Sequence, residues 1–563
     1  MGEPQPQLQS NQSASHRPES RVLAAALFLL AGFVTFAAGN TEVAAAGDDS
    51  DTNAPAAGAA PEPTFTIKQI RVRGATRLKP DEIEDVIYPF VGPDRTLSDV
   101  EAARSALEKA HHEKGFEAVA VEIPEQNGTR GIVFLDVKEN PVGRLRVKGA
   151  KYFLPEEVKK GAPSLQEGRV VDFNEVKKDI VRLNAWPDRR VTPVLRPGIT
   201  PGTVDVDLNV EDSLPLHGSI EINNRYSPET TELRLNGSIS YNNLWQLGHS
   251  AGFSFQIAPQ RLEDAEVYSA YYIARFSQWP EFSLMLMGTK QNSDVSTLGG
   301  AAVAGRGEIL GLRGMFTLPS EGVFSHSLNL GIDYKHFDED VTLGADSFST
   351  PIDYYPFTFG YGASWTRPKS FTELNGSVNF ALRGLGSRPA TFDAKRYEAD
   401  GGYFYVRGDL SHTHDLPGGF QVFGKVQGQA SKDPLVNSEQ FAGGGLATVR
   451  GYLESELLGD SGWFVTTELR SPSFLSPWVK VEEGKDPPTE WRLHAFFDGG
   501  RLYLNDPLPE QKDVFDLASV GLGTRLRLFE HLNGSIDVAW PLVDQTTTRS
   551  GDPFFSFRFW ADF

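Results

Sequence analysis

A glycine-rich segment near the C-terminal end, residues 440–462, carries an arginine in a setting suited to binding a carboxylate. Its centre reads Val449-Arg450-Gly451-Tyr452. A guanidinium fork binds a carboxylate through two charge-assisted hydrogen bonds, and Gly451 lets the backbone turn sharply at a loop tip. The segment is too glycine-rich and too charged for a membrane strand, so we expect a long loop. These residues alone leave open that Arg450 is a solvated loop residue.

Catalytic chemistry is not expected, because no catalytic motif occurs in a matching context. The Gly-x-Ser-x-Gly match at 248–252 lies at the start of the strand predicted over 249–257 and not at the strand-to-helix turn of a nucleophile elbow. There is no His-Glu-x-x-His zinc motif and no phosphate-binding P-loop. Cysteine is absent, which excludes thiol chemistry and cysteine metal sites. His111 and His112 lack a third metal ligand at a suitable spacing, and we expect both to be solvated on a helix. The sequence therefore predicts no enzymatic activity, no metal ion and no cofactor.

The N-terminal end has the plan of a secretory signal peptide. Arginines precede an apolar stretch at 22–38, and small residues follow up to Ala46, which predicts a signal peptide over 1–46. An uncleaved anchor helix is the alternative. Residues 47–63 then form a flexible linker rich in alanine and proline. The net charge of −20 argues against a nucleic-acid partner.

Two consecutive stretches, 64–140 and 141–213, show the same predicted order of elements, βααββ, which indicates a repeated module. The first begins with one predicted strand over 65–72. Its second helix is expected to start at a capping box formed by Ser98 and Glu101. The other predicted elements are helices at 80–88, 154–160 and 176–183, and strands at 119–123, 131–137, 144–148, 190–195 and 203–210.

From residue 216 onward, apolar and polar residues alternate with period two in short segments. Leu233, Leu235, Ile239 and Tyr241, for example, share one face of a predicted strand. A tilted membrane strand needs about ten such residues. The strands of a soluble β-sandwich also alternate apolar and polar residues. Strand number, the content of aromatic residues and alternating short and long connections distinguish a membrane barrel. Sixteen strands are predicted, at 216–226, 232–243, 249–257, 265–276, 282–291, 306–316, 325–337, 354–367, 371–383, 403–412, 420–430, 463–470, 491–498, 516–529, 534–540 and 553–563.

Several short motifs follow one another along the chain. They are KGFEAV at 114–119, IPEQ at 123–126, PDR at 187–189, PVLRPG at 193–198, PLHGS at 215–219, NNR at 223–225, NLW at 243–245 and GH at 248–249. Each is weak alone, but their order is specific. With these motifs in this order, the two modules, the barrel and VRGY at 449–452, the chain resembles the two-partner secretion transporters. These form the haemolysin secretion/activation family (TpsB) of the outer-membrane-protein insertase superfamily.

The resemblance implies the domain organisation. The modules at 64–140 and 141–213 are expected to be POTRA domains, and residues 214–563 a sixteen-stranded antiparallel transmembrane β-barrel. Many such transporters also carry a plug helix, which we do not expect here because the linker is poor helix material. The last strand ends in Phe559 and Phe563, which resemble the signal that hands outer-membrane proteins to their assembly machinery. A simple closing strand is the alternative.

The resemblance also gives Arg450 a partner. In this family the VRGY loop folds back into the barrel lumen, and its arginine contacts an aspartate of a Phe-x-Asp-x-Gly motif on a late strand. Here that motif is Phe496-x-Asp498-x-Gly500, on the thirteenth predicted strand. Without the resemblance, Asp498 would be an ordinary turn residue.

Function follows from the same resemblance. The protein is expected to be a translocase in the outer membrane of a Gram-negative bacterium, with its POTRA modules in the periplasm. There they would capture an unfolded partner exoprotein by β-augmentation, which then passes through the barrel without ATP and folds at the surface. The other expected partners are the assembly machinery and outer-membrane lipid, and the chain is expected to be a monomer. The alternative is an insertase for other outer-membrane proteins; a passive porin or receptor leaves the repeated module unexplained.

Overall fold

The computed structural model describes residues 63–563, except for 128–129, 293–294, 297–302, 305, 321, 339, 344–345, 350, 476–486 and 510. The predicted signal peptide and nearly all of the predicted linker therefore lie outside the described residues. The chain divides into two compact units, and the boundary falls between Pro215 and Leu216. Among the described residues, no helix is long and apolar enough to cross a membrane.

The first module has a divided first strand. β1 (Phe65–Ile67) pairs with β3 (Gly92–Arg95), whereas β2 (Gln69–Arg73) pairs in parallel with β5 (Ile132–Lys138). The single strand expected over 65–72 is therefore wrong, because the chain changes partner at Lys68. β4 (Ala120–Glu122) completes the sheet β2-β5-β4. The helices are α2 (Pro80–Ile87), the short η1 (Tyr88–Phe90) and α3 (Leu97–Glu113).

Helix α3 begins two residues earlier than expected. Its N-cap is Thr96, whose side chain accepts a bond from the Asp99 N–H, while the Asp99 carboxylate accepts from the Thr96 N–H. This capping box replaces the one expected at Ser98 and Glu101, a pair with the same spacing two residues further along the chain. The expectation of a solvated His111 is also wrong. The ring is fully buried with its Nδ1 2.8 Å from the Leu107 carbonyl oxygen, because this side of the helix packs on the sheet.

The second module repeats the arrangement. Its sheet has the order β6-β8-β7, formed by β6 (Val142–Lys148), β7 (Arg189–Pro197) and β8 (Val204–Asp212). Its helices are α4 (Pro155–Lys160), η3 (Pro163–Leu165) and α5 (Phe173–Leu183). The modules meet where the Phe173 N–H donates to the Gly115 carbonyl (2.8 Å) and the Asn174 amide donates to that of Lys114 (3.1 Å). The motif at 114–119 thus contributes to the joint between them.

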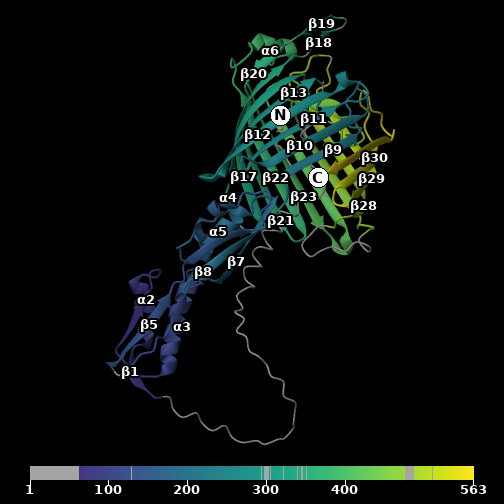
Figure 1. Cartoon of the computed structure of the whole chain (residues 1–563). Coiled ribbons are helices and arrows are strands. Elements are labelled where there is room, and N and C mark those ends of the chain that lie inside the picture. The colour runs from purple at the N-terminus through teal and green to yellow at the C-terminus, as the bar shows by residue number, and fades with distance from the viewer. Residues whose placement is uncertain are drawn as a thin grey trace, which may run out of the picture. The chain divides into compact units, whose positions relative to one another are not determined.

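The rest of the chain forms a closed sixteen-stranded antiparallel barrel (Figure 1). Every strand pairs with the next along the chain, and the sixteen predicted strands are confirmed. β20 and β21 pair with the same neighbour, β17, and together make one strand interrupted before Phe357. The barrel strands are β9 (Leu216–Asn223), β10 (Arg234–Leu244), β11 (His249–Ile257), β12 (Glu266–Phe276), β13 (Trp279–Asn292), β16 (Gly307–Thr317), β17 (Phe324–Phe337), β20 (Ile352–Tyr354), β21 (Phe357–Arg367), β22 (Ser370–Ala381), β23 (Tyr403–Asp415), β24 (Gln421–Ser431), β27 (Ser461–Arg470), β28 (Glu490–Tyr503), β29 (Val514–Leu528), β30 (Leu532–Pro541) and β31 (Phe554–Asp562).

The barrel closes between its last strand, β31, and its first strand, β9. Backbone pairing continues to the chain end, where Phe563 and Gly218 exchange two hydrogen bonds of 3.0 and 3.1 Å. At the other end of this β31–β9 junction, called the seam below, the Asn224 side chain makes hydrogen bonds to the backbone of β31. It donates to the Phe555 carbonyl (2.8 Å) and accepts from the Phe557 N–H (2.7 Å).

Some long connections contain structure that the sequence did not reveal. Residues 384–402, expected as a loop, contain α6 (Pro389–Lys395), whose Phe392 is buried. Two short hairpins pair β14 (Val295–Ser296) with β15 (Val303–Ala304) and β18 (Asp340–Leu343) with β19 (Asp346–Ser349). The short η4 (Leu262–Asp264) and η5 (Pro417–Gly419) lie in other connections.

Candidate functional site

The connection between β24 and β27, residues 432–460, is called the lumen loop below. It contains a small hairpin in which β25 (Phe441–Gly443) pairs with β26 (Leu457–Gly459). The four residues of the motif at 449–452 lie between these strands. Val449, Arg450 and Tyr452 are all buried. A 29-residue polar connection would normally be exposed to solvent, so its burial requires a wall on several sides.

That wall is the interior face of the barrel. On β27, Trp463 and Leu469 are about half exposed, whereas the alternate residues Glu468 and Arg470 are buried. Successive side chains of a strand point to opposite faces, so the exposed apolar residues mark the outer surface. The lumen loop contacts Glu468, on the opposite face. The loop therefore folds back into the space that the barrel encloses.

The structure brings Arg450 and Asp498 into direct contact. Arg450 Nε donates to Asp498 Oδ2 at 2.7 Å and Nη2 donates to Oδ1 at 2.9 Å, which is a bidentate pair. The Arg450 backbone N–H donates to the same carboxylate at 3.1 Å. The guanidinium carbon also lies 3.5 Å from the centre of the Phe496 ring, a close cation–π contact. Arg450 and Asp498 are 4% and 1% exposed, so this pair is shielded from solvent and salt.

Glu468 is a second carboxylate at this site that the sequence analysis did not identify. It accepts from Arg450 Nη1 at 2.8 Å and from Arg525 Nη2 at 2.9 Å through Oε1, and from Arg470 through Oε2. Three arginines thus share two carboxylates, on the adjacent strands β27 and β28. A usable signal was present, because a charged residue inside a membrane strand usually faces the interior and marks a functional position.

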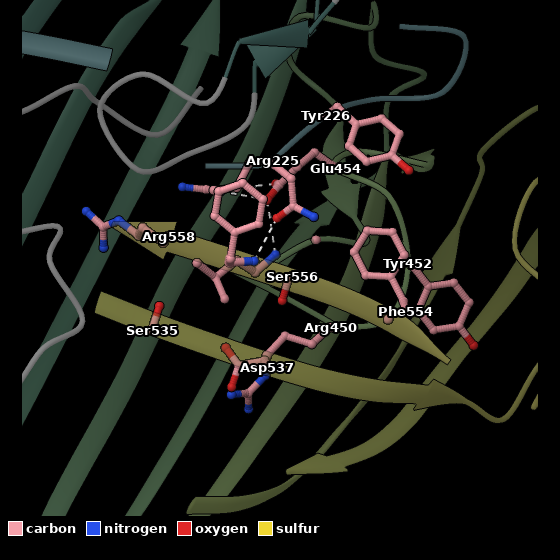
Figure 2. Close-up of a pocket in the computed structure, with 15 residues that line it drawn as sticks. Arg225, Tyr226, Arg450, Tyr452, Glu454, Ser535, Asp537, Phe554, Ser556 and Arg558 are labelled. Atoms are coloured by element: carbon pink, nitrogen blue, oxygen red, sulfur yellow. Dashed lines mark hydrogen bonds and ion pairs between the residues drawn. The ribbon is translucent and has the colours of Figure 1, made fainter. Parts of the chain in front are cut away.

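Residues 449–455 are called the tip of the loop below. The tip has a further set of contacts beyond Arg450 (Figure 2). Glu454 accepts from Arg225 Nε at 2.7 Å and donates its backbone N–H to the Tyr226 carbonyl at 2.9 Å. The Tyr452 hydroxyl lies 2.9 Å from the Val543 carbonyl. These partners come from the connections after β9 and after β30, so the tip touches both sides of the barrel seam. Sequence reasoning did not find them.

Gly451 has the conformation that the motif requires. Its φ of 94° lies in the region that favours glycine. A Cβ at this position would also stand 3.1 Å from the Ala539 Cβ. Backbone conformation and close approach to the wall therefore both favour glycine here.

A cavity beside the tip has a volume of about 20 Å³ and is lined by Arg225, Arg450, Asp537 and Arg558 among others. In Figure 2 the Arg450 side chain points toward Asp537 across this space. A volume of this size holds about one water molecule.

The other predicted site residues lie elsewhere. Gly500 is buried on β28, close to the Phe464 ring. Phe559 and Phe563 are exposed on the outer face, at 45% and 65%, and do not join the Arg450 cluster. The cluster itself holds a loop by ion pairs and offers no nucleophile.

The sequence is similar to a protein family and to individual transporters. The family described as "Haemolysin secretion/activation protein ShlB/FhaC/HecB" matches residues 202–526, and "POTRA domain, ShlB-type" matches 65–140. The outer membrane transporter CdiB of Escherichia coli is 24% identical over 505 residues, covering 85% of this chain and 79% of the relative. The heme/hemopexin transporter protein HuxB of Haemophilus influenzae (strain ATCC 51907 / DSM 11121 / KW20 / Rd) is 22% identical over 499 residues, covering 85% and 84%.

Solved structures show the same fold. CdiB from Escherichia coli superimposes with a TM-score of 0.59 at 21% identity, over 92% of this chain and 93% of that one. BamA from Haemophilus ducreyi, lacking its POTRA domains 1–3, gives a TM-score of 0.53 at 15% identity, over 89% and 100%.

We predict that Arg450 and Asp498 stabilise the barrel jointly. Arg450→Ala leaves Asp498 buried with its bidentate partner removed and should lower the free energy of unfolding by about 3–5 kcal/mol. The double variant Arg450→Ala/Asp498→Ala removes both charges and should be more stable than Arg450→Ala alone. The shift of the barrel band on heating in SDS gels measures this. Additive effects of the two substitutions would contradict the pairing.

Proposed function

The chain belongs to the haemolysin secretion/activation family ShlB/FhaC/HecB, and on that premise we propose how it moves its partner across the outer membrane. It is an outer-membrane transporter of two-partner secretion with periplasmic POTRA modules, and it is not an enzyme. The proposed route has three steps. The modules capture an unfolded exoprotein, the lumen loop is displaced, and the exoprotein leaves through the barrel without ATP. The observation that carries the proposal is the buried contact of Arg450 with Asp498 and Glu468, called the Arg450 clamp below, which holds the lumen loop inside the barrel.

Capture is proposed to occur at β2 of the first module, because the other edges of the two three-stranded sheets are covered or blocked. The edge of β4 is occupied by helix α3, where Glu108 accepts from the Val121 N–H at 3.1 Å. In the second module, β7 contains Pro193 and Pro197, which lack the N–H that strand pairing needs.

The remaining edge strand of the second module is partly covered as well. On β6, the N–H groups of Val142 and Leu145 donate to the Arg169 carbonyl and to the Glu167 carboxylate, at 2.8 and 3.2 Å. β2 lies at the edge of its sheet and pairs with β5. An extended client can therefore add a strand beside β2 through backbone bonds that do not depend on its sequence.

Release of the loop is proposed to be the step that opens the barrel. The clamp is made of ion pairs and hydrogen bonds, which re-form when the client has left. Because the pairs are buried, separating them without replacement costs several kcal/mol. Polar groups of the passing client and entering water would offset that cost. Folding of the client at the cell surface would then give the movement its direction.

Export should depend on the clamp. We expect Arg450→Ala to reduce secretion of the exoprotein by about tenfold or more, because the loop loses the contact that fixes its position. The barrel should still be inserted, as measured by surface protease protection and heat modifiability. The matched control is Arg501→Ala on the same strand, β28, since Arg501 and Asp516 form an exposed pair, with side chains 44% and 50% exposed, that contributes little. Normal secretion by Arg450→Ala would contradict the role of the loop.

Depletion of the protein separates secretion from the alternative role of an insertase. Secretion predicts loss of one exoprotein from the medium, with unchanged amounts of other outer-membrane barrels. A general loss of barrels from the outer membrane would instead identify an insertase. Quantitative analysis of isolated outer membranes and culture medium gives both readouts. The likeness to BamA concerns the fold alone and does not favour either result.

Capture at β2 is tested with proline at two successive positions, Arg71 and Val72. Successive N–H groups of a strand point to opposite sides. One substitution should therefore break the ladder to β5 and destabilise the module, and the other should remove an outward N–H while the module stays folded. The fold-preserving variant should lose binding of the purified exoprotein. Unchanged binding by that variant would exclude β2 as the capture edge.

A further inference from the structure

The first part of the lumen loop, residues 432–442, is called the stem below, and it contributes Glu439 to a second buried ion pair, with Lys335 of β17. Lys335 Nζ donates to Glu439 Oε1 at 2.8 Å. The Tyr354 hydroxyl donates to the same oxygen at 2.7 Å, and the Tyr405 hydroxyl donates to Oε2 at 2.9 Å. Lys335 and Glu439 are each 1% exposed. Both carboxylate oxygens of Glu439 are therefore bound to groups on the barrel wall.

The surroundings of this pair are strongly apolar. The buried residues packed there come from the barrel wall, from α6 and from the loop itself: Phe337, Ile352, Tyr354, Ala381, Phe392, Ala399, Tyr403, Tyr405, Leu435 and Val436. Water is excluded from such a cluster, so neither charge is stabilised by solvent. Removing one partner leaves the other buried without its counter-charge. The Lys335–Glu439 pair consequently holds the stem firmly in place.

The stem and the tip bind different parts of the barrel wall. Lys335, Tyr354 and Tyr405 belong to β17, β20 and β23, whereas Glu468 and Asp498 belong to β27 and β28. In the order of the closed barrel these two groups do not overlap. The loop is thus fixed to two separate stretches of the barrel wall.

Between the two fixed places lies a run of three glycines, 443–445. Gly444 and Gly445 have φ angles of 100° and 90°, which other residues rarely adopt. Glycine has the widest choice of backbone conformations and absorbs large changes of φ and ψ at a hinge. The chain can therefore bend here while the stem stays in place.

We propose that Glu439 and Lys335 are positioning residues that fix the stem of the lumen loop independently of the Arg450 clamp. Displacement of the loop is then limited to residues 446–456, between the glycine run and β26, and the stem with its β25–β26 pairing remains bound while the tip moves. This keeps Arg450 within reach of Asp498 after each export event. The proposal concerns the same loop as the proposed function, and it rests on that function only where export is measured.

Two single-cysteine probes test the proposal in the full-length protein, which contains no cysteine of its own. Ser438→Cys reports on the stem and Ser455→Cys reports on the tip; the two serines are 4% and 7% exposed. Each probe is placed in the otherwise unchanged protein, in Arg450→Ala and in Glu439→Gln. The readout is the rate of labelling by a water-soluble maleimide in purified, detergent-solubilised protein.

We expect Arg450→Ala to raise labelling of the tip probe by about tenfold while the stem probe stays protected. Glu439→Gln should raise labelling of the stem probe. The control Glu308→Gln breaks the exposed pair with Lys290, with side chains 57% and 72% exposed, and should change neither rate. Equal exposure of both probes in Arg450→Ala would show that the loop moves as one body and would overturn the proposal. So would a protected stem probe in Glu439→Gln.

A second variant separates electrostatic anchoring from general damage to the fold. Lys335→Met/Glu439→Gln removes both charges at similar volume and should protect the stem probe better than Glu439→Gln does. Stem labelling as fast as in Glu439→Gln would overturn the proposed pairing. Export is measured in the same strains. The expected labelling pattern with undiminished export in Arg450→Ala would support the stem anchor and refute the proposed role of the loop in transport.

Discussion

A buried arginine must keep its charge satisfied, and the interior of this barrel is arranged around that requirement. A guanidinium stays protonated in proteins, so Arg450 cannot be buried as a neutral group. It needs carboxylates at fixed positions, and Asp498 and Glu468 provide them. These two carboxylates hold the polar loop against the interior wall in this structure.

The alternation of side chains along the barrel strands places the groups that bind Arg450. Asp498 and Phe496 are two residues apart on β28 and face the same side, so one binds the guanidinium edge and the other covers its flat face. Glu468 pairs with Phe496 across the ladder, which places its carboxylate beside the same guanidinium. A closed barrel has no free edges, and its register cannot slip without breaking many bonds. The geometry of the clamp is therefore rigid on the wall side, and adjustment is left to the loop.

A loop that is fixed by polar pairs suits a transporter better than one fixed by apolar packing alone. Apolar contacts are non-directional and tolerate sliding, whereas a bidentate pair re-forms in one geometry. The loop combines both kinds of contact. Phe441, Val449 and Tyr452 pack with Phe464 and Leu502 of the wall, while the charged groups set the register of the tip.

The sequence by itself determined the barrel and its strand number, because alternation of period two follows from the chain alone and each strand repeats it. The partnership of Arg450 with Asp498 was accessible through resemblance of the two motifs. Sequence did not reveal α6, the divided first strand, Glu468 as a shared carboxylate, or the pair of Lys335 and Glu439. These depend on which strands become neighbours and which side chains face inward at the same height. Lys335 and Glu439 are 104 residues apart, and only closure of the barrel brings them together.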